Sequence, residues 1–505
     1  MQKNILEYLE ETALTHRDKL AFSNGKEGLT FGEVYSRSRA IGSFLADNGY
    51  YREPIAIIMD KHPNTLTAFW GTVYAGCFYA CIDEKMPQAR ILAIFEKLMP
   101  KAIICDAKSY KLAASLGIDN IYLYDDIVSY TENPNALAEI RRKQSSTDAI
   151  YVAFTSGSTG TPKGVVACHR SVIDYTEALC EALPFSEDTV FANQTPLYFD
   201  APLKEIMPTL KLGATTYFVP KMLFSFPIRL VDYLDEYKIN TVCWVVSALV
   251  QISSLGALEN HAPKHLSTVC FGSELFPRKQ YDLWRAALPS AKFFNLYGPT
   301  EATGMSCYWR ADRELDINEP IPIGRPFDNT DIILLDEENK RVSDGGDGEI
   351  CIRGTCVTMG YYNNKARTDE AFVQNPLNTA YSEIIYRTGD IGRINSFGEL
   401  VFVTRKDNQI KHMGHRIELG EIESSAMKHA DVSRAICLYN KDKKEIALFY
   451  VGNCDEKQML ATLTNVLPRY MLPSYVEKMQ ELPLTDNGKI NRRALIERTD
   501  RKENT

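Results

Sequence analysis

The sharpest local signal in the sequence is the stretch AIYVAFTSGSTGTPKG, residues 149–164. Its first six residues, AIYVAF, form an apolar run with the length and composition of a buried strand. Hydroxyl residues and glycines follow, and the loop closes with Lys163 and Gly164. Glycines let a backbone approach a ligand closely, while hydroxyls, exposed amides and a lysine suit a polyanion. A flexible Ser/Gly loop is the alternative, but a lysine ending such a loop between a strand and a helix favours phosphate binding.

This loop differs from the Walker phosphate loop at two positions. Pro162 stands where that pattern has its second glycine, and Gly164 stands where it has a hydroxyl residue. The loop is therefore expected to be a nucleotide-binding loop of another type.

The rest of the chain alternates strands with helices. We expect strands at 54–60, 101–106, 149–154, 214–220 and 240–246, and helices at 62–74, 168–182, 225–237 and 278–287. Repeated strand–helix units predict an α/β fold with mostly parallel sheets. Strands and turns dominate later, which predicts a strand-rich subdomain at about 325–404. The polar residues Thr404–Asp407 predict a boundary between an N-terminal domain, 1–404, and a small α+β domain, 405–505.

Composition excludes several classes of function. The 505 residues carry 57 basic and 65 acidic side chains, a net charge of −8, which argues against nucleic-acid or membrane partners. The 12 cysteines show no zinc-ligand spacing and are expected to be buried thiols. The N-terminus does not have the pattern of a signal peptide, and no apolar run is long enough to cross a bilayer. A cytoplasmic location is therefore expected.

Four further motifs follow the loop in order. They are Asn295-Leu296-Tyr297-Gly298-Pro299-Thr300-Glu301, Tyr386-Arg387-Thr388-Gly389-Asp390, Arg405-Lys406-Asp407 leading to Gly414–Glu423, and Asn487-Gly488-Lys489-Ile490. With the loop they resemble the adenylate-forming superfamily, most of all amino-acid adenylation domains of non-ribosomal peptide synthetases and D-alanine–carrier-protein ligases. The resemblance runs from Leu29 to Lys489. It implies a large N-terminal domain of stacked sheets with helices and a strand-rich subdomain, and a small mobile C-terminal domain.

The resemblance implies an ATP site with Mg²⁺. The loop would hold the β- and γ-phosphates, Thr300 the α-phosphate and Glu301 the metal. Tyr297 would stack near the adenine, while Asp390 and Arg405 would contact the ribose. The implied ATP-binding residues are Thr155, Ser156, Gly157, Ser158, Thr159, Gly160, Lys163, Asn295, Tyr297, Gly298, Thr300, Asp390 and Arg405.

Catalysis is assigned by the same resemblance to Lys489, Thr300 and Glu301. Lys489 would bridge the substrate carboxylate and the α-phosphate, where charge peaks in the transition state. Because Lys489 lies in the small domain, the domains must close for chemistry, with Asp407 as the hinge. A later rotation would admit a phosphopantetheine thiol.

The segment Pro196–Ala201 bears on the acid that is activated. Asp200 matches the aspartate that pairs with a substrate ammonium in the amino-acid branch. As an alternative, Asp200 caps the helix that follows. Further substrate-pocket positions carried over by the resemblance are Ala201, Lys204, Trp244, Cys270, Gly272, Leu296, Gly304 and Met305.

Two of these positions bear on specificity. Lys204 would either meet a polar or acidic substrate side chain or, as the favoured prediction, extend outward to pair with Glu205 or Glu301. Gly272 stands where D-alanine ligases usually carry a cysteine, and the cysteine of this chain, Cys270, comes two residues earlier. That departure argues against D-alanine.

The implied function is ATP-dependent formation of an aminoacyl-adenylate, followed by transfer to a separate phosphopantetheinylated carrier protein, since no carrier module follows Lys489. An acyl- or aryl-CoA ligase is one alternative. A non-catalytic adenylate-binding protein is another, although such a protein would be expected to lose Lys489, Glu301 or Asp390.

Overall fold

The computed structural model describes residues 2–157, 161–316, 319–407, 409–441, 443–483 and 490–501. The chain forms two compact units. The first comprises Met1–Glu84, Met99–Ala153 and Gly164–Lys406, and the second Lys85–Leu98, Phe154–Lys163 and Asp407–Thr505. The division at Lys406 and Asp407 lies two residues beyond the boundary expected from the sequence. In addition, the second unit takes in two segments from earlier in the chain.

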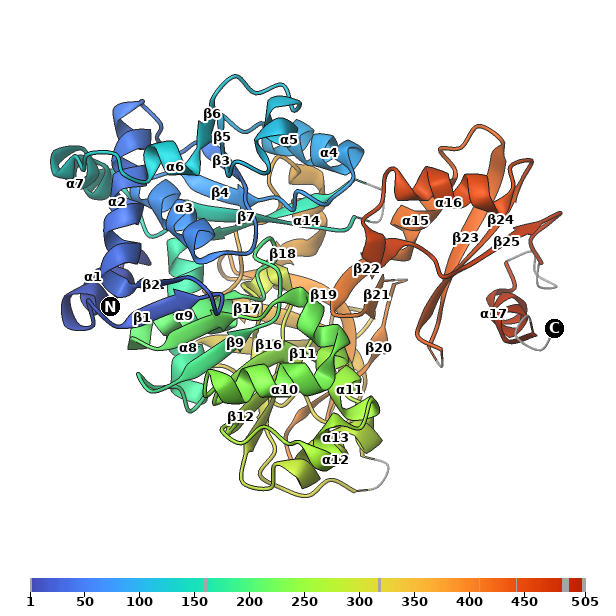
Figure 1. The fold of residues 1–505 in the computed structure, drawn as a ribbon. Coiled ribbons are helices and arrows are strands. Elements are labelled where there is room, and N and C mark those ends of the chain that lie inside the picture. The colour runs from blue at the N-terminus through green and yellow to red at the C-terminus, as the bar shows by residue number, and fades with distance from the viewer. Residues whose placement is uncertain are drawn as a thin grey trace. The chain divides into compact units, whose positions relative to one another are not determined.

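Two large sheets form the framework of the first unit (Figure 1). The nine-stranded sheet has the order β15 (Arg325–Pro326), β14 (Cys307–Arg310), β13 (Lys292–Tyr297), β12 (Thr268–Gly272), β11 (Thr241–Val245), β9 (Val190–Asn193), β10 (Thr215–Phe218), β1 (Leu20–Ser23), β2 (Gly28–Thr30). The six-stranded sheet has the order β6 (Ile121–Leu123), β5 (Ala102–Cys105), β3 (Pro54–Ile58), β4 (Phe78–Cys81), β7 (Ala149–Thr155), β8 (Lys163–Cys168). The strands from β13 to β1 in the first sheet are all parallel, which is typical of sheets covered by helices on both faces.

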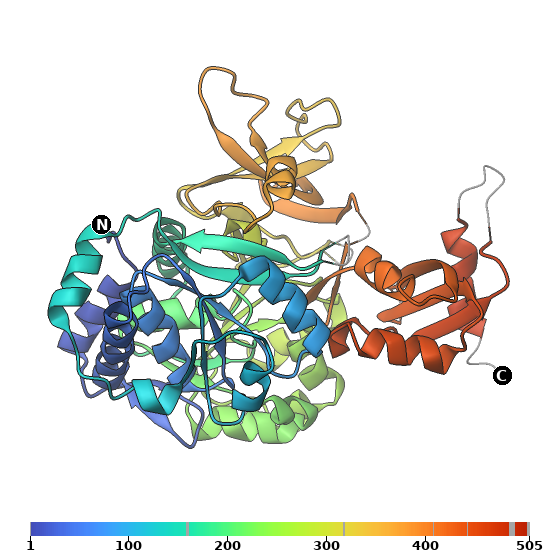
Figure 2. The ribbon, with the colours of Figure 1, turned by 90° about the horizontal axis from the view of Figure 1, so that it is seen from above.

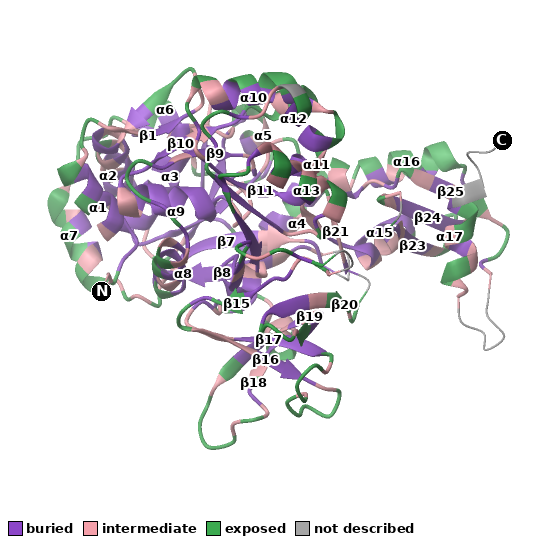
Figure 3. Cartoon of the chain, turned by 90° about the horizontal axis from the view of Figure 1, so that it is seen from below, coloured by how far each residue is buried: buried purple, intermediate pink, exposed green. Residues whose placement is uncertain are grey.

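Helices cover these sheets in layers. One core cluster joins side chains of both sheets to α1 (Leu6–Thr15), α2 (Phe31–Asp47), α3 (Pro63–Tyr74), α8 (His169–Ala182) and α9 (Leu203–Leu212). A second cluster packs α10 (Pro227–Glu236), α11 (Val246–Ser254), α12 (Ala257–Asn260) and α13 (Arg278–Ala287) against the other face of the nine-stranded sheet. Figure 3 shows the sheets buried and the outer sides of these helices exposed. The remaining helical segments are α5 (Tyr110–Ala114), α6 (Tyr124–Ile127), α7 (Pro134–Lys143), η1 (Lys221–Ser225) and η2 (Thr300–Ala302).

A third sheet forms the strand-rich part of the first unit and stands beside β7 and β8 (Figure 2). It contains β16 (Thr330–Leu335), β17 (Gly348–Gly354), β19 (Ile384–Ile394), β18 (Phe372–Gln374) and β20 (Leu400–Arg405), and α14 (Lys365–Ala371) precedes β18. All of its pairings are antiparallel.

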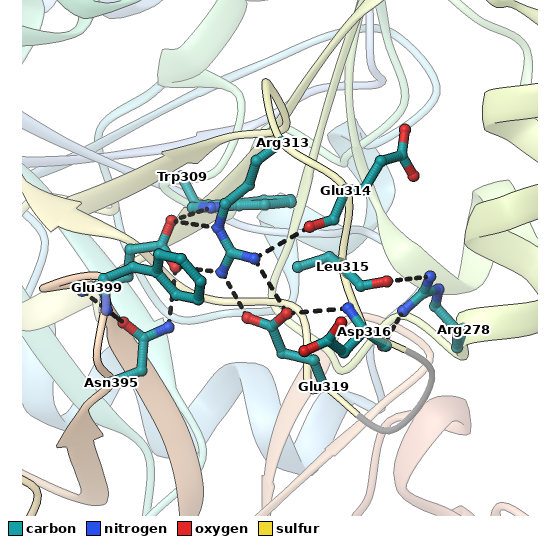
Figure 4. A network of polar contacts seen from close by, with 10 residues as sticks. Arg278, Trp309, Arg313, Glu314, Leu315, Asp316, Glu319, Asn395 and Glu399 are labelled. Carbon is teal, nitrogen blue, oxygen red and sulfur yellow. Dashed lines mark hydrogen bonds and ion pairs between the residues drawn. The ribbon is translucent and has the colours of Figure 1, made fainter.

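Arg313 ties this third sheet to the edge of the nine-stranded sheet (Figure 4). Its guanidinium donates to Glu319 Oε1 at 2.5 Å and to Glu399 Oε2 at 2.6 Å. Glu399, which lies in the turn between β19 and β20, also accepts from the indole of Trp309 at 2.8 Å. Because Trp309 is in β14, these contacts hold β19 and β20 next to β13 and β14.

The second unit contains a hairpin, a small sheet and several helices. The hairpin is β21 (Gln409–His412) with β22 (His415–Glu418), and the sheet is β23 (Val432–Asn440), β24 (Glu445–Gly452), β25 (Tyr475–Met479). The helices are α4 (Gln88–Leu98), α15 (Leu419–Ala426), α16 (Glu456–Thr464), η3 (Arg469–Met471) and α17 (Arg492–Arg501). This is a small α+β body with its own apolar core.

The fold class predicted from the sequence is confirmed, and every strand and helix expected above has a counterpart within a few residues. One local prediction is wrong. The loop after β7 leads into β8, its neighbour in the sheet, and not into a helix. Lys163 is the first residue of β8, so a helix N-terminus cannot supply the positive end of a dipole at this loop.

Candidate active site

The candidate site lies at the carboxyl ends of parallel strands. The chain leaves β9 into the loop that carries Asp200, leaves β12 at Gly272, and leaves β13 at Tyr297 before Thr300 and Glu301. Parallel strands bring their carboxyl ends to one edge of a sheet, which is where open α/β sheets bind ligands. The predicted substrate and nucleotide residues of the first unit therefore converge at one edge.

Asp200 is half-buried, and it does not cap a helix. Helix α9 begins at Leu203 with Pro202 as its N-cap, and no side chain caps it, so the alternative interpretation of Asp200 as a helix cap is wrong. A Cβ atom built on Gly304 would lie 3.5 Å from Asp200 Oδ2. Burial raises the pKa of Asp200, against a hydrogen bond with Thr300 and the charge of Lys204. Asp200, Thr300 and Gly304 thus lie next to one another.

Lys204 is directed inward. It is 2% exposed, so the prediction that it extends outward is wrong. Its neighbour Glu205 is fully buried, and burial raises the pKa of that carboxyl to about 8. Burial also lowers the pKa of Lys61 to about 7, and the Lys61 ammonium donates to the Asn193 and Gln194 carbonyls at 2.9 and 3.0 Å. The first turn of α9 therefore buries two ionisable side chains, Lys204 and Glu205.

Trp244 and Cys270, two predicted pocket residues on neighbouring strands, belong to different core clusters. Trp244 packs in the second core cluster, next to Phe224, and its indole donates to the Ala192 carbonyl at 2.6 Å. Cys243, one residue earlier, lies in the first cluster and pairs in register with Cys270. Successive side chains of a strand point to opposite faces. Trp244 therefore faces away from Cys270, and Cys243, which the sequence analysis did not name, lies on the face of Cys270.

Two other predicted pocket residues lie in the core cluster of Cys270. Leu296 and Met305 are buried in the same cluster, and Ala201 precedes α9. Gly272 does more than leave room, because a Cβ atom there would lie 2.2 Å from the Leu296 carbonyl oxygen. The close approach of β12 to β13 requires a residue without a side chain.

On the nucleotide side, Asp390 is held by two donors. The Tyr297 hydroxyl donates to Asp390 Oδ2 at 2.6 Å, and the Arg405 guanidinium pairs with Oδ1. Asp390 is 3% exposed, and its backbone amide donates to the Thr388 hydroxyl at 3.0 Å. Since each carboxylate oxygen has two lone pairs, both retain acceptor capacity for ribose hydroxyls.

Three other predicted nucleotide residues have structural contacts. Glu301 is fully buried, and its Oε1 accepts from the Tyr361 hydroxyl at 2.7 Å. Asn295 donates its amide to the Pro322 carbonyl at 2.7 Å. Gly298 packs so closely on Met305 that a Cβ would lie 2.5 Å from its Cα. Tyr361 had no local signal in the sequence, since only the fold brings it to Glu301.

The described part of the phosphate loop belongs to the second unit. The Ser156 hydroxyl donates to the Arg416 carbonyl at 2.8 Å, and the Lys163 ammonium lies 3.2 Å from Glu418 Oε1. A Cβ on Gly157 would lie 2.0 Å from the Thr161 carbonyl oxygen, so the tight loop needs glycine there. Thr155 is half-buried at the end of β7. Ser158, Thr159, Gly160 and Lys489 lie outside the described residues. Asp407 is the first residue of the second unit after Lys406.

No group of three or more His, Cys, Asp or Glu side chains in the described part of the chain could hold a metal ion. No described helix has both the length and the apolar character to cross a bilayer.

The fold is α/β, and Asp200 and Thr300 follow the carboxyl ends of the parallel strands β9 and β13. The chain matches the family described as "AMP-binding enzyme" over residues 9–362. It belongs to that family.

Relatives and solved structures agree with this assignment. The chain is 31% identical over 98% of its length to the D-alanine–D-alanyl carrier protein ligase of Bacillus licheniformis, and covers 99% of that ligase. It is also 31% identical over 98% of its length to bacitracin synthase 1 of Bacillus licheniformis, of which it spans only 9%. The adenylation domain AlmE of Vibrio cholerae, solved with glycyl-adenosine-5'-phosphate, has the same fold with a TM-score of 0.85 at 19% identity, covering 99% of this chain and 98% of that one.

Proposed function

We propose that this chain activates an amino acid with ATP as an aminoacyl-adenylate and transfers it to the phosphopantetheine thiol of a separate carrier protein. The observation that carries the proposal is the placement of Asp200 beside Thr300 and Gly304. A carboxylate that folding takes partly out of water is stabilised by a cationic partner. The ammonium of an amino acid would supply one at the spot where Thr300 would meet the α-phosphate.

Relatives support the class of reaction. The D-alanine ligase named above joins its amino acid to a carrier protein, and so does the L-proline–[L-prolyl-carrier protein] ligase of Streptomyces coelicolor, which is 30% identical over 97% of this chain and 96% of that ligase. Asp200 argues against an acyl- or aryl-CoA ligase, whose substrate has no ammonium. The presence of Glu301 and Asp390 at one edge argues against a non-catalytic protein.

In the first step, an oxygen of the substrate carboxylate attacks the α-phosphorus of ATP. The bond between that phosphorus and the oxygen that bridges to the β-phosphorus breaks, and pyrophosphate leaves. Asp200 would hold the ammonium and Asp390, with Tyr297 and Arg405, the ribose. Thr300 and Lys489 would meet the charge that gathers at the α-phosphate, by positioning and electrostatic stabilisation.

Glu301 fits the magnesium ion expected with ATP. Mg²⁺ usually binds through one or two carboxylates together with the substrate's phosphates, and not in a cage made by the protein alone. Glu301 is a single buried carboxylate, and no larger acidic cluster occurs among the described residues, which agrees with this coordination preference of Mg²⁺. The ion would neutralise phosphate charge during the transfer.

In the second step, the thiol sulfur attacks the acyl carbon and loses its proton, the bond from that carbon to the phosphate oxygen breaks, and AMP leaves. We place the hinge for the intervening domain rotation at Asp407, where the second unit begins. Asp407→Pro should impair thioester formation more than adenylation. Equal retention of both half-reactions would argue against a hinge there.

ATP–pyrophosphate exchange over the L- and D-amino acids, with aryl and fatty acids added, tests the proposal. We expect exchange with an amino acid, reduced about 30- to 1,000-fold in Asp200→Asn, because the substrate ammonium would lose its charged partner at a cost of about 2–4 kcal/mol. Lys489→Ala should lose about as much. Asp188→Asn, an exposed aspartate before β9, is the matched control and should exchange normally.

Two other outcomes of the exchange assay would favour the alternative functions. Exchange with aryl or fatty acids alone would favour a CoA ligase. No exchange with any acid, in protein that still binds ATP, would favour the non-catalytic alternative.

A further inference from the structure

Lys61 connects the two large sheets at their carboxyl ends. It lies in the turn between β3, a strand of the six-stranded sheet, and α3. Its ammonium donates to the carbonyl oxygens of Asn193 and Gln194, at 2.9 and 3.0 Å. Asn193 is the last residue of β9, in the nine-stranded sheet. The side chain of Lys61 therefore ties the end of β9 to the six-stranded sheet.

The surroundings of Lys61 strengthen these hydrogen bonds. The residue is half-buried, and its ammonium lies 5.8 Å from the centroid of the Phe218 ring. Hydrogen bonds from a charged donor are roughly twice as strong as neutral ones, and partial exclusion of water strengthens them further. The Val219 amide donates to the same Asn193 carbonyl at 3.0 Å. Lys61 thus extends the bonding at the end of β9 beyond the strand, to Gln194.

The segment after β9 forms a loop that is closed at its base. The loop carries Asp200, whose backbone carbonyl accepts from the Leu203 amide at 2.9 Å where α9 begins. The side-chain amide of Asn193 donates to Glu205 Oε2 at 3.3 Å, which joins the start of the loop to the first turn of α9. Lys61 binds this same base through the Asn193 carbonyl. Because the loop is closed, a displacement of its base should carry Asp200 with it.

The loop also packs directly on the six-stranded sheet. A cavity of about 20 Å³ lies between them, lined by Tyr79 and Cys81 of β4, residues 151–153 of β7, residues 197–200 of the loop and Leu203. A space of this size holds about one water molecule, so the loop and the sheet are close together. The position of Asp200 therefore depends on the spacing between the two sheets, which Lys61 helps to set.

We propose that Lys61 is a positioning residue, whose ammonium holds the end of β9 against the six-stranded sheet and thereby places Asp200 for the ammonium of the substrate. This inference rests on the proposed function, in which Asp200 binds that ammonium. Lys61 would act on the substrate only through Asp200.

The first test measures the order of the loop and needs no activity. Lys61→Met removes the charge and the donors but keeps a long unbranched side chain, whereas Lys61→Arg keeps a charge and donors. Amide hydrogen exchange, followed by mass spectrometry on the whole chain, should show protection of residues 194–202 reduced about 10-fold or more in Lys61→Met. Lys61→Arg should keep most of the protection. Unchanged protection in Lys61→Met would overturn the inference.

The second test separates positioning from a general loss of structure. In ATP–pyrophosphate exchange, Lys61→Met should raise KM for the amino acid about 10- to 100-fold, as for a binding group moved out of place, with little change in KM for ATP. Lys61→Arg should restore most of the loss. If both KM values are unchanged, or if both rise equally, Lys61 does not position Asp200 and the inference fails.

A double-mutant cycle then shows whether Lys61 acts through Asp200. In an Asp200→Asn background, the further change Lys61→Met should alter the exchange rate by less than about 2-fold, because the group that Lys61 positions is already lost. If Lys61→Met costs as much in that background as in the unaltered chain, it acts by another route and the inference is wrong.

Lys19→Met is the matched control. Lys19 is also half-buried, and its ammonium donates to the Glu187 carbonyl at 2.5 Å, just before the amino end of β9. Its loss should leave the protection of residues 194–202 and both KM values as in the unaltered chain. Equal effects of Lys19→Met and Lys61→Met would contradict a specific role of the carboxyl end. If the unaltered chain exchanges with no amino acid, the proposed function is rejected, while hydrogen exchange still tests whether Lys61 orders the loop.

Discussion

The hydrogen bond from Tyr297 to Asp390 offers a sharp test of the nucleotide site. The hydroxyl donates at 2.6 Å to a carboxylate that is 3% exposed, and Tyr297 is itself 5% exposed. Tyr297→Phe removes this donor and keeps the ring, so no large cavity opens. Hydrogen bonds to charged groups contribute about 1.5–3 kcal/mol, and the free energy of unfolding should fall by about that amount.

The same variant separates two roles of Tyr297 in ATP binding. If the hydroxyl positions Asp390 for the ribose, Tyr297→Phe should raise KM for ATP in the exchange assay. If the ring acts only by stacking on adenine, Tyr297→Phe should bind ATP normally and Tyr297→Ala should not.

Tyr308→Phe is the matched control for this pair of measurements. Tyr308 lies on the neighbouring strand β14 and stacks on Phe327, and its hydroxyl has no hydrogen-bond partner among the described residues. Its loss should change the free energy of unfolding by less than about 0.5 kcal/mol. Urea unfolding of the three proteins gives the comparison. A Tyr297→Phe protein as stable as Tyr308→Phe, with unchanged KM for ATP, would refute the reasoning.

Three further predictions concern packing and pH. Gly272→Ala should lower the free energy of unfolding by about 2–4 kcal/mol, because its Cβ would lie 2.2 Å from the Leu296 carbonyl oxygen. Gly117→Ala is the control, since Gly117 lies in open space, although at positive φ. Urea titration of both variants measures how much more Gly272→Ala is destabilised than Gly117→Ala. Trp244→Phe should lower the free energy of unfolding by about 1–3 kcal/mol, because the Ala192 carbonyl loses the indole donor. The order of amino-acid preference in the exchange assay should not change in Trp244→Phe. Cys243→Val should alter that order. The hydrogen bond from Arg313 lowers the pKa of the Glu319 carboxyl in the folded protein. The ion pair therefore contributes to stability above the pKa that Glu319 has in the unfolded chain, and this contribution is lost as the pH falls through the pKa of the folded protein. The difference in unfolding free energy between the unaltered chain and Glu319→Gln should shrink from pH 7 to pH 3. A difference that is constant with pH would contradict this pairing.

Much of the fold could be predicted from local patterns. The apolar runs at 54–60 and 240–246 and the helix at 278–287 appear close to their expected bounds, because periodicity and length report burial directly. Asp200 and Asp390 were found through motifs, and the fold leaves Asp200 half-buried near Gly304 and buries Asp390 in a hydrogen bond with Tyr297.

The errors have a common physical origin. In TVCWV both Cys243 and Trp244 are buried, because a parallel sheet is covered on both faces, and its strands do not show the alternation that would tell one face from the other. Lys204 has a side chain long enough to extend outward or inward, and only the packing of α9 decides which. The loop after β7 could lead into a helix or a strand by composition alone.

The sequence by itself determined the α/β class, the order of the motifs and the residue types that can meet ATP and an ammonium, because these depend on local periodicity and side-chain chemistry. The tertiary structure sets the opposite faces to which Cys243 and Trp244 point, the burial of Lys204, and the contacts of Tyr297, Arg405 and Tyr361 with the carboxylates of Asp390 and Glu301. Those facts depend on segments up to 93 residues apart in the chain, whose approach no local pattern encodes.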